Sequence, residues 1–432
     1  MSKKINIGVF PCGSEVGLEI NRSLKYYKEF NLIGLNSTRD YSYLSYSDYI
    51  EDLPFIHEDT FFEKLVEIIN DREIRYLIPA MDEVGYLLKK NEKKICCEIV
   101  YPEFSIAEIL RRKSSTYKKL KNILNTPNVY SDLDEIEKKL PVFIKPDIGY
   151  GSRGAKKIKN LDELHAELDR SQELLIMEYL PGDEFTVDCF SDSNGKLLFA
   201  GARIRQRVRM GISVSTKKIS NEKKFNTIAK RISEELKMSG VWFFQLKEDK
   251  NKKLTLLEVG GRVSGSMALY RGMGLNFIAL DLFQRIGEEI KIPKLISHSA
   301  SLERSLNCSI NLDFDFNTVY CDLDDCLIID NKVNKKLVTF LYQCLNKNKK
   351  LVLITRHEIK PAITLNKYRL SNLFDRVVHI KDRSVSKAEF ITDKSAIFVD
   401  DSFQEREKVS DLKGIPVFAP DAIELLITEH FD

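Results

Sequence analysis

The stretch IKPDIGYGSRG, residues 144–154, decides the fold of the larger part of this chain. A lysine ends an apolar, strand-like segment and is followed by a loop that contains three glycines. Glycine lets backbone N–H groups approach phosphate oxygens closely, and a neighbouring lysine supplies positive charge beside them. A glycine-rich hairpin without a ligand is the alternative. The stretch predicts a phosphate-binding loop at the end of a strand.

Two segments further along the chain carry residues suited to a nucleotide. The segment MEYLPGDEFTVD, residues 177–188, is extended next to a turn, so its backbone can face an adenine ring while Glu184 accepts hydrogen bonds from ribose hydroxyls. Gln245 and Glu258 lie on two neighbouring strand-like segments and offer the oxygen ligands that Mg²⁺ prefers. Arg262 follows, and we expect it to neutralise charge on a transferred phosphoryl group.

Arginines alternate with other residues in RIRQRVRMG, residues 203–211. Alternate side chains of a strand share a face, so one face would carry four guanidinium groups. Arginine binds carboxylates and phosphates bidentately, which favours a substrate clamp made of Arg203, Arg205 and Arg207. A solvated edge strand is the alternative. The place of this run between the two segments above favours the clamp.

Residues 1–112 have the pattern of a small α/β unit. Helical stretches separate four apolar, strand-like runs, at residues 5–10, 32–35, 76–79 and 98–101. Such alternation is typical of a parallel sheet. Gly13 and Gly17 follow the first run but do not complete the GxGxxG pattern of a dinucleotide-binding loop. We interpret them as a tight turn that opens a helix.

The order of these motifs resembles the ATP-grasp family, of the carbamoyl-phosphate-synthase large-subunit type, over residues 1–300. The resemblance implies a Rossmann-like pre-ATP-grasp domain at residues 1–112 and an ATP-grasp domain at residues 113–300. It implies that Mg²⁺, or Mn²⁺ in its place, binds Gln245 and Glu258. The implied ATP contacts come from Lys113, Lys145, Gly149, Gly151, Ser152, Gly154, Glu178, Leu180 and Glu184.

The family's chemistry is the activation of a carboxylate by ATP. An acyl phosphate forms, and an amine or a thiol then displaces phosphate, while the protein positions groups and neutralises charge. This sequence departs from the family pattern at Gly260, where an asparagine usually follows the metal-binding glutamate by two residues. That departure bears on the second magnesium ion, and therefore on the activity of this module.

A second diagnostic stretch is TVYCDLDDCLII, residues 318–329. An apolar strand delivers Asp322 and Asp324 at its end, and two carboxylates so close repel each other unless a cation lies between them. Asp322 can then attack a phosphoryl group while Asp324 protonates the leaving oxygen. Two later apolar strands end in polar residues as well, Thr355 after one and Asp400-Asp401 after the other. Active sites of open parallel sheets lie at that edge.

This arrangement resembles the haloacid-dehalogenase-like superfamily over residues 317–432, after a linker at residues 301–316. The resemblance implies a Rossmann-like phosphatase domain, with little or no cap because the interval between Asp322 and Thr355 is short. Its catalytic lysine is Lys387, with Lys381 as the alternative. The implied residues are the nucleophile Asp322, the acid/base Asp324, the hydroxyl of Thr355, and a metal site of Asp322, Asp324, Asp400 and Asp401.

Bulk properties narrow the class of protein. The chain has 432 residues, which suggests two to four domains, and 67 basic and 64 acidic residues leave a net charge of +3. This near balance gives no reason to propose nucleic acid or membrane partners. Eight scattered cysteines without CxxC pairs, and an N-terminus that leads directly into a strand, predict reduced thiols in a cytoplasmic protein.

Taken together, the sequence predicts an α/β and α+β multidomain, bifunctional enzyme that uses ATP and Mg²⁺. One module would be a carboxylate–amine or carboxylate–thiol ligase and the other a Mg²⁺-dependent phosphatase of the same pathway. We expect small-molecule carboxylate, amine and phosphate-ester partners, and the sequence is compatible with a homodimer. The alternative is that one module alone is catalytic, more readily the phosphatase, while the other binds a nucleotide or substrate in a regulatory role.

Overall fold

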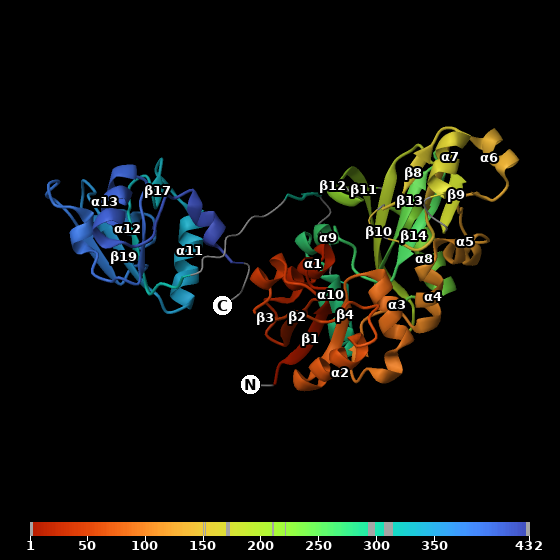
Figure 1. The fold of residues 1–432 in the computed structure, drawn as a ribbon, viewed down its shortest axis with the longest axis horizontal. Helices are drawn as coiled ribbons and strands as arrows, with labels where there is room; N and C mark the ends of the chain where they lie inside the picture. The colour runs from red at the N-terminus through yellow and green to blue at the C-terminus, as the bar shows by residue number, and fades with distance from the viewer. Residues whose placement is uncertain are drawn as a thin grey trace. The chain divides into compact units, whose positions relative to one another are not determined.

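The computed structural model describes residues 3–149, 151, 153–169, 173–209, 211–220, 222–292, 299–305 and 314–428. The chain divides into two compact units, Met1–Ser305 and Leu306–Asp432, which we call unit 1 and unit 2. Unit 1 runs from red to green in Figure 1, and unit 2 from cyan to blue.

Unit 1 begins with a five-stranded parallel sheet in the order β3-β2-β1-β4-β5. Its central strands are mostly apolar because helices and loops bury both faces of the sheet there. The strands are β1 (Ile5–Phe10), β2 (Phe30–Leu35), β3 (Asp48–Ile50), β4 (Ile74–Pro79) and β5 (Glu98–Ile99). The helices of this region are α1 (Glu15–Leu24), η1 (Tyr41–Leu44), α2 (Phe61–Asp71), α3 (Asp82–Lys90) and η2 (Glu92–Lys94).

The turn after β1 is dictated by packing. The hydroxyl of Ser14 accepts a hydrogen bond of 3.0 Å from the backbone N–H of Gly17 and so caps α1. A Cβ atom on Gly17 would lie 2.4 Å from the carbonyl oxygen of Cys12, and one on Gly13 would overlap the carboxylate of Asp40. Both glycines are therefore required by the close approach of the helix to the chain around it, which is the structural role expected for them.

Two antiparallel sheets form the rest of unit 1. The smaller has the order β6-β9-β7-β8 and the larger the order β14-β13-β10-β11-β12-β15. The smaller contains β6 (Val129–Tyr130), β7 (Val142–Pro146), β8 (Lys156–Ile158) and β9 (Leu174–Glu178). The larger contains β10 (Glu184–Ser191), β11 (Leu197–Arg209), β12 (Ile212–Lys218), β13 (Gly240–Glu248), β14 (Leu254–Gly260) and β15 (Ser301–Glu303).

Helices cover these sheets and connect them to the parallel sheet. Helix α8 packs on β10 and β11 through an apolar face that includes Phe225, Ile232 and Leu236, and α10 packs on α1 and β13. The helices are α4 (Phe104–Arg111), α5 (Lys113–Leu120), α6 (Leu133–Lys139), α7 (Leu161–Leu168), α8 (Lys223–Leu236), α9 (Ala268–Gly272) and α10 (Phe277–Arg285).

The linker expected at residues 301–316 begins later than the sequence suggested. Residues 301–303 form β15, which pairs with β12, and the N–H of Arg304 donates a 2.8 Å hydrogen bond to the carbonyl of Val214. Compact unit 1 accordingly extends to Ser305. Residues 306–313 of the expected linker lie outside the described residues.

Unit 2 is built on a five-stranded parallel sheet in the order β20-β19-β16-β21-β22. Only a short hairpin and one helix separate the first strand from the second, which leaves no separate cap domain between them. The strands are β16 (Thr318–Cys321), β19 (Lys350–Thr355), β20 (Arg376–His379), β21 (Ala396–Val399) and β22 (Val417–Phe418), with the hairpin β17 (Ile328–Ile329) and β18 (Lys332–Val333). The helices are α11 (Lys335–Asn346), α12 (Pro361–Lys367), η3 (Lys387–Phe390), α13 (Phe403–Lys413) and η4 (Ala422–Leu426).

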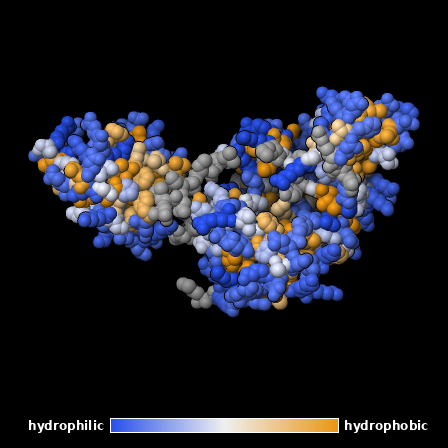
Figure 2. Space-filling model, viewed as in Figure 1, coloured by the Kyte–Doolittle hydropathy of each residue, from blue (hydrophilic) through white to orange (hydrophobic). Residues whose placement is uncertain are grey.

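Hydrophilic residues cover much of the face shown in Figure 2, with hydrophobic residues in small groups between them. Across the described ranges, no helix has both the length and the apolar character needed to cross a bilayer. The seven cysteines in these ranges are all free thiols, and five of them are buried.

Candidate active sites

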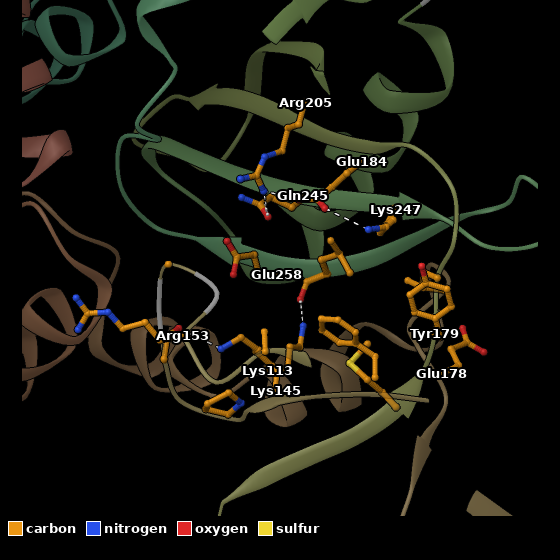
Figure 3. Close-up of a pocket in the computed structure, with 18 residues that line it drawn as sticks. Lys113, Lys145, Arg153, Glu178, Tyr179, Glu184, Arg205, Gln245, Lys247 and Glu258 are labelled. Carbon is orange, nitrogen blue, oxygen red and sulfur yellow. Dashed lines mark hydrogen bonds and ion pairs between the residues drawn. The ribbon is translucent and has the colours of Figure 1, made fainter. Parts of the chain in front are cut away.

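A cleft in unit 1 is lined by residues of both antiparallel sheets and of α5. It encloses about 780 Å³, open solvent included. Figure 3 shows Lys113 and Lys145 on one wall and Glu184, Arg205 and Gln245 on the other.

The lysine wall is held together by the start of α5. Lys145 Nζ donates hydrogen bonds to the hydroxyl of Tyr117 (2.8 Å) and the carbonyl of Leu257 (3.1 Å). Lys113 Nζ donates to the carbonyl of Gly149 (3.2 Å), and the carboxylate of Asp147 accepts from the N–H and hydroxyl of Ser114.

Burial lowers the pKa of Lys145 to about 8, against the attraction of Glu258. Lys113 and Lys145, the two lysines expected to contact phosphates, lie on the same wall of the cleft (Figure 3).

The glycine loop bends beside these lysines. Gly151 and Gly154 have φ values of +62° and +71°, which side-chain-bearing residues rarely adopt. A Cβ atom on Gly154 would also lie 3.1 Å from the ring of Pro146. Gly149 and Gly151 line the cleft, whereas Ser152, a residue expected to contact ATP, lies outside the described residues.

The opposite wall carries the oxygen donors. Gln245 on β13 and Glu258 on β14 are direct cross-strand partners, which is why their side chains share one face of the sheet. Arg205 Nη1 donates to Gln245 Oε1 (3.1 Å) and to Glu184, and its Nη2 donates to the carbonyl of Gly211 (2.7 Å). The two residues expected to hold magnesium are thus adjacent, and Arg205 holds one of them in place.

The end of β9 closes the cleft. Glu178, Tyr179 and Leu180 all line it, and Leu180 is buried. The carboxylate of Glu178 accepts a 2.7 Å hydrogen bond from Asn128 Nδ2. Glu184, expected to hold ribose hydroxyls, is engaged by Arg205 and lies 3.5 Å from Lys247 Nζ.

A second, wider cavity continues from the cleft. The two cavities share Gly151, Arg153, Arg205, Gln245 and Glu258. Arg262 lines the second cavity, where its Nε and Nη2 donate to one carboxylate oxygen of Asp82 at 3.0 and 2.7 Å. Ser264 and Arg304 also line it. A ligand in the second cavity would meet a ligand in the cleft at Glu258.

Of the three arginines expected to form one clamp, Arg203 and Arg205 both line the second cavity, and Arg207 does not. Arg203 is buried in an ion pair with Asp188 and also donates to Ser264. Arg205 lines both cavities, whereas Arg207 has a 67% exposed side chain, lies 3.5 Å from Glu303 and lines neither cavity. Arg207 departs from the other two where the strand pairing shifts register, between Arg205 and Arg207 and again after Arg207.

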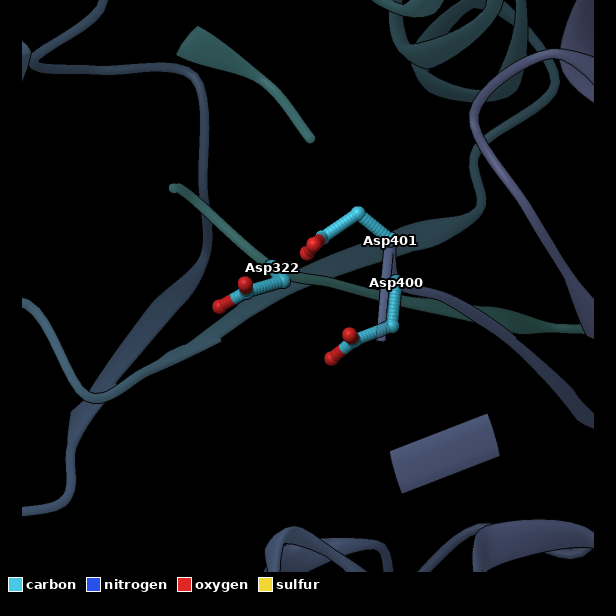
Figure 4. Close-up of side chains that lie close together, drawn as sticks. All are labelled: Asp322, Asp400 and Asp401. Atoms are coloured by element: carbon cyan, nitrogen blue, oxygen red, sulfur yellow. The ribbon is translucent and has the colours of Figure 1, made fainter. Parts of the chain in front are cut away.

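Unit 2 gathers its polar groups at the ends of adjacent strands. Asp322 follows β16, and Asp400 and Asp401 follow β21. One oxygen from each of these three carboxylates lies within 4.8 Å of the others. Figure 4 shows the three side chains close together. Lys387 Nζ lies 2.9 Å from Asp322 Oδ1 and 2.7 Å from Asp400 Oδ2.

Charge and burial oppose each other at this cluster. Burial raises the pKa of Asp322 to about 7, against the attraction of Lys387. Burial also disfavours the ammonium of Lys387, but the carboxylates of Asp322 and Asp400 outweigh it and raise the pKa of this lysine. Of the two lysines left open by the sequence, Lys387 lies in the cluster and Lys381 is exposed elsewhere on the loop.

Asp324, expected as acid/base, is held by a residue that the sequence did not single out. Its Oδ1 lies 2.7 Å from Nδ1 of His357, two residues after Thr355. The N–H of His357 donates a 3.2 Å hydrogen bond to the buried hydroxyl of Thr355. The sequence gives His357 no evident role, because its partners are distant along the chain. Tyr117, Asp82 and Arg304 in unit 1 were missed for the same reason.

Comparison with protein families gives one match. Residues 170–304 match a family model described as "ATP-grasp in the biosynthetic pathway with Ter operon". No curated protein matches the chain.

Several solved structures resemble the chain. N5-carboxyaminoimidazole synthetase from Staphylococcus aureus with ADP is 15% identical, with a TM-score of 0.58, covering 70% of this chain and 83% of that one. A biotin carboxylase–β,γ-ATP complex from Campylobacter jejuni is 14% identical, with a TM-score of 0.56 and coverage of 67% and 72%. L-amino acid ligase from Bacillus licheniformis is 19% identical, with a TM-score of 0.53 and coverage of 66% and 74%. At these identities the likeness is one of fold.

Proposed function

We propose that unit 1, in which the family model identifies an ATP-grasp domain, is an ATP-dependent ligase that joins a carboxylate to an amine through an acyl phosphate. One observation carries this proposal. The cleft presents Lys113 and Lys145 on one wall and Gln245 and Glu258 on the other, and it opens into a second cavity at Glu258. A nucleotide with its phosphates between these walls would direct its terminal phosphate to the junction of the two cavities.

The donor set fits a magnesium ion. Gln245 and Glu258 offer two oxygen ligands on paired strands, and an ion bound there would supply charge neutralisation to the phosphates. The lysines would hold phosphate oxygens from the opposite wall. Arg262 lies near the junction, where it donates to Asp82 and to the carbonyl of Val263, and a substrate could displace Asp82. The similarity in fold to an L-amino acid ligase supports an amine as the second substrate.

The reaction divides into two balanced steps. A carboxylate oxygen attacks the terminal phosphorus of ATP, the bond to the bridging oxygen breaks, and ADP leaves. The amine nitrogen then attacks the acyl carbon of the acyl phosphate, phosphate leaves, and the nitrogen loses a proton to give the amide. Thiols can replace amines in the second step. The protein contributes positioning and charge throughout.

The test is a screen of carboxylates and amines for ATP-dependent phosphate release, with hydroxylamine added to trap an acyl phosphate as its hydroxamate. We expect Glu258→Ala to abolish turnover and Glu63→Ala, on the surface of α2, to leave it unchanged. Phosphate release without any carboxylate requirement would contradict the ligase proposal.

For unit 2 we propose a phosphatase of the haloacid-dehalogenase type, because Lys387 bridges Asp322 and Asp400 at the edge of a parallel sheet. The carboxylates of Asp322, Asp400 and Asp401 fit a Mg²⁺ ion, which would screen their repulsion and that of the phosphoryl oxygens. Lys387 would hold Asp322 in its ionised, nucleophilic form.

The proposed phosphatase reaction is also balanced. An oxygen of Asp322 attacks phosphorus, the ester P–O bond breaks, and Asp324 gives its proton to the leaving oxygen. Asp324 then takes a proton from the water that attacks the aspartyl phosphate, so the net change is the hydrolysis of one ester to an alcohol and phosphate.

Hydrolysis of phosphate esters by the purified protein tests this assignment. Asp322→Asn is expected to abolish it, whereas Asp421→Asn, at an exposed position of the same unit, is expected to retain it. If hydrolysis persists in Asp322→Asn at the wild-type rate, unit 2 is not the source of the activity. Running both assays on each variant separates a bifunctional enzyme from a chain with one catalytic unit.

A further inference from the structure

We propose that His357 is a positioning residue for the acid/base Asp324, an inference that rests on the proposed phosphatase function. The Nδ1 atom of His357 lies 2.7 Å from Oδ1 of Asp324. The side chain of Asp324 is 49% exposed, so its carboxyl group would otherwise rotate in solvent. The imidazole, only 16% exposed, gives it a fixed partner.

The ring and the backbone of His357 are held by contacts from three elements. Its Nε2 lies 2.6 Å from the hydroxyl of Thr364 on α12. Its backbone N–H donates to the hydroxyl of Thr355 at the end of β19, and its carbonyl accepts a 2.7 Å hydrogen bond from Nε2 of His379 at the end of β20. Rotation of the ring would break the contacts with both Asp324 and Thr364. His357 is therefore a rigid support rather than a mobile surface residue.

One neutral tautomer satisfies every contact of the ring. With the proton on Nδ1, the ring donates to Oδ1 of Asp324, and its Nε2 accepts from the hydroxyl of Thr364. Oδ1 can accept this bond whether Asp324 is ionised or protonated on its other oxygen. The same support therefore serves both halves of the reaction, in which Asp324 first loses and then regains a proton.

The consequence is a division between the two oxygens of Asp324. His357 occupies Oδ1, so Oδ2 is left to carry the proton toward the leaving group. Without His357 the carboxyl group can turn, and the step that suffers is protonation of the leaving oxygen. Alkyl esters need that proton because an alkoxide is a poor leaving group, whereas a nitrophenolate leaves without it.

The experiment compares two substrates, p-nitrophenyl phosphate and glycerol 3-phosphate, with the full-length protein and Mg²⁺. We expect His357→Ala to lower kcat for the alkyl ester by about 10²-fold, the lower range for acid–base catalysis, and for the aryl ester by less than about threefold. KM should change little for either ester. His357→Asn, whose amide can donate to Asp324, should recover part of the alkyl-ester activity, and His165→Ala in unit 1 should match the wild type.

A double variant tests whether the effect passes through Asp324. Asp324→Asn with His357→Ala should be no slower on the alkyl ester than Asp324→Asn alone. Equal losses on both esters in His357→Ala, without rescue by asparagine, would show a merely structural role and overturn the inference while leaving the phosphatase intact. If the wild type shows no hydrolysis that depends on Asp322, the phosphatase function falls, and this role of His357 falls with it.

Discussion

The ring of Phe243 occupies the space that a side chain at position 260 would need. A Cβ atom on Gly260 would lie 2.4 Å from this ring, because the two residues are direct cross-strand partners on β13 and β14. The ring also lies 5.3 Å from the guanidinium of Arg262. The glycine therefore packs against an aromatic residue beside the candidate metal ligands, at the position where the resemblance to ATP-grasp proteins leads us to expect an asparagine.

The contact between Phe243 and Gly260 predicts that an asparagine introduced alone at position 260 destabilises the protein. Gly260→Asn should lower the free energy of unfolding of unit 1 by about 1–3 kcal/mol, the usual cost of overpacking. In a Phe243→Ala background, where the buried ring is gone, the same Gly260→Asn change should cost less, as a double-mutant cycle by urea denaturation would show. If Gly260→Asn alone is as stable as the wild type, the ring does not restrict position 260.

The pKa of Lys145 predicts a pH dependence for nucleotide binding. Burial lowers this pKa to about 8, so the lysine is cationic below that pH and neutral above it. Affinity for ATP should therefore be level up to about pH 7 and fall above pH 8, by at most about tenfold per pH unit. Isothermal titration calorimetry between pH 6.5 and 9.5 measures this affinity for ATP. Lys145→Met should bind weakly with a flatter profile, and a wild-type affinity that is constant up to pH 9.5 would exclude this role.

Two arginines on the same strand should behave differently. Arg205→Ala removes the partner of Glu184 and Gln245 inside the cleft, so we expect a loss in kcat/KM for ATP of about tenfold or more. Arg207→Ala removes only an exposed ion pair, and it should stay within about twofold of the wild type. Steady-state kinetics measured in parallel on the two variants compares their kcat/KM for ATP. Similar losses in both would support a single arginine clamp instead.

Lys387 should matter to the stability of unit 2 as well as to its activity. Lys387→Ala leaves two buried carboxylates without their cation, which typically costs about 3–5 kcal/mol. Lys381→Ala, at an exposed position, should cost almost nothing. Thermal unfolding with and without Mg²⁺ measures the stability of both variants. Added Mg²⁺ should partly restore the stability of Lys387→Ala, because it can screen the same carboxylates. Equal stability of both variants would contradict the central place of Lys387.

Strand positions could be read from the sequence where burial is complete. The run expected at residues 5–10 is β1, because a strand covered on both faces is apolar at most positions. The adjacency of Gln245 and Glu258 also follows from two short strands joined by a turn. Asp322 and Asp400 meet because parallel strands end at one edge.

Other features depend on register and on distant partners. Burial of Arg203 follows from Asp188 on the neighbouring strand, and no periodicity reveals which residues face each other there. The shift that turns Arg207 away arises from bulges that carry no sequence signal. Likewise, Lys387 could be told from Lys381 only once the loop was folded, and His357 gained its role from a carboxylate 33 residues away.

The division of the chain at Ser305 has a genetic consequence. The residues of one candidate site all precede this boundary, and those of the other all follow it. A defect at Glu258 and a defect at Asp322 should therefore complement each other in trans: a cell that carries one allele of each kind should regain the phenotype that either allele alone abolishes. Alleles that unfold a whole unit would complement only those that damage the opposite unit.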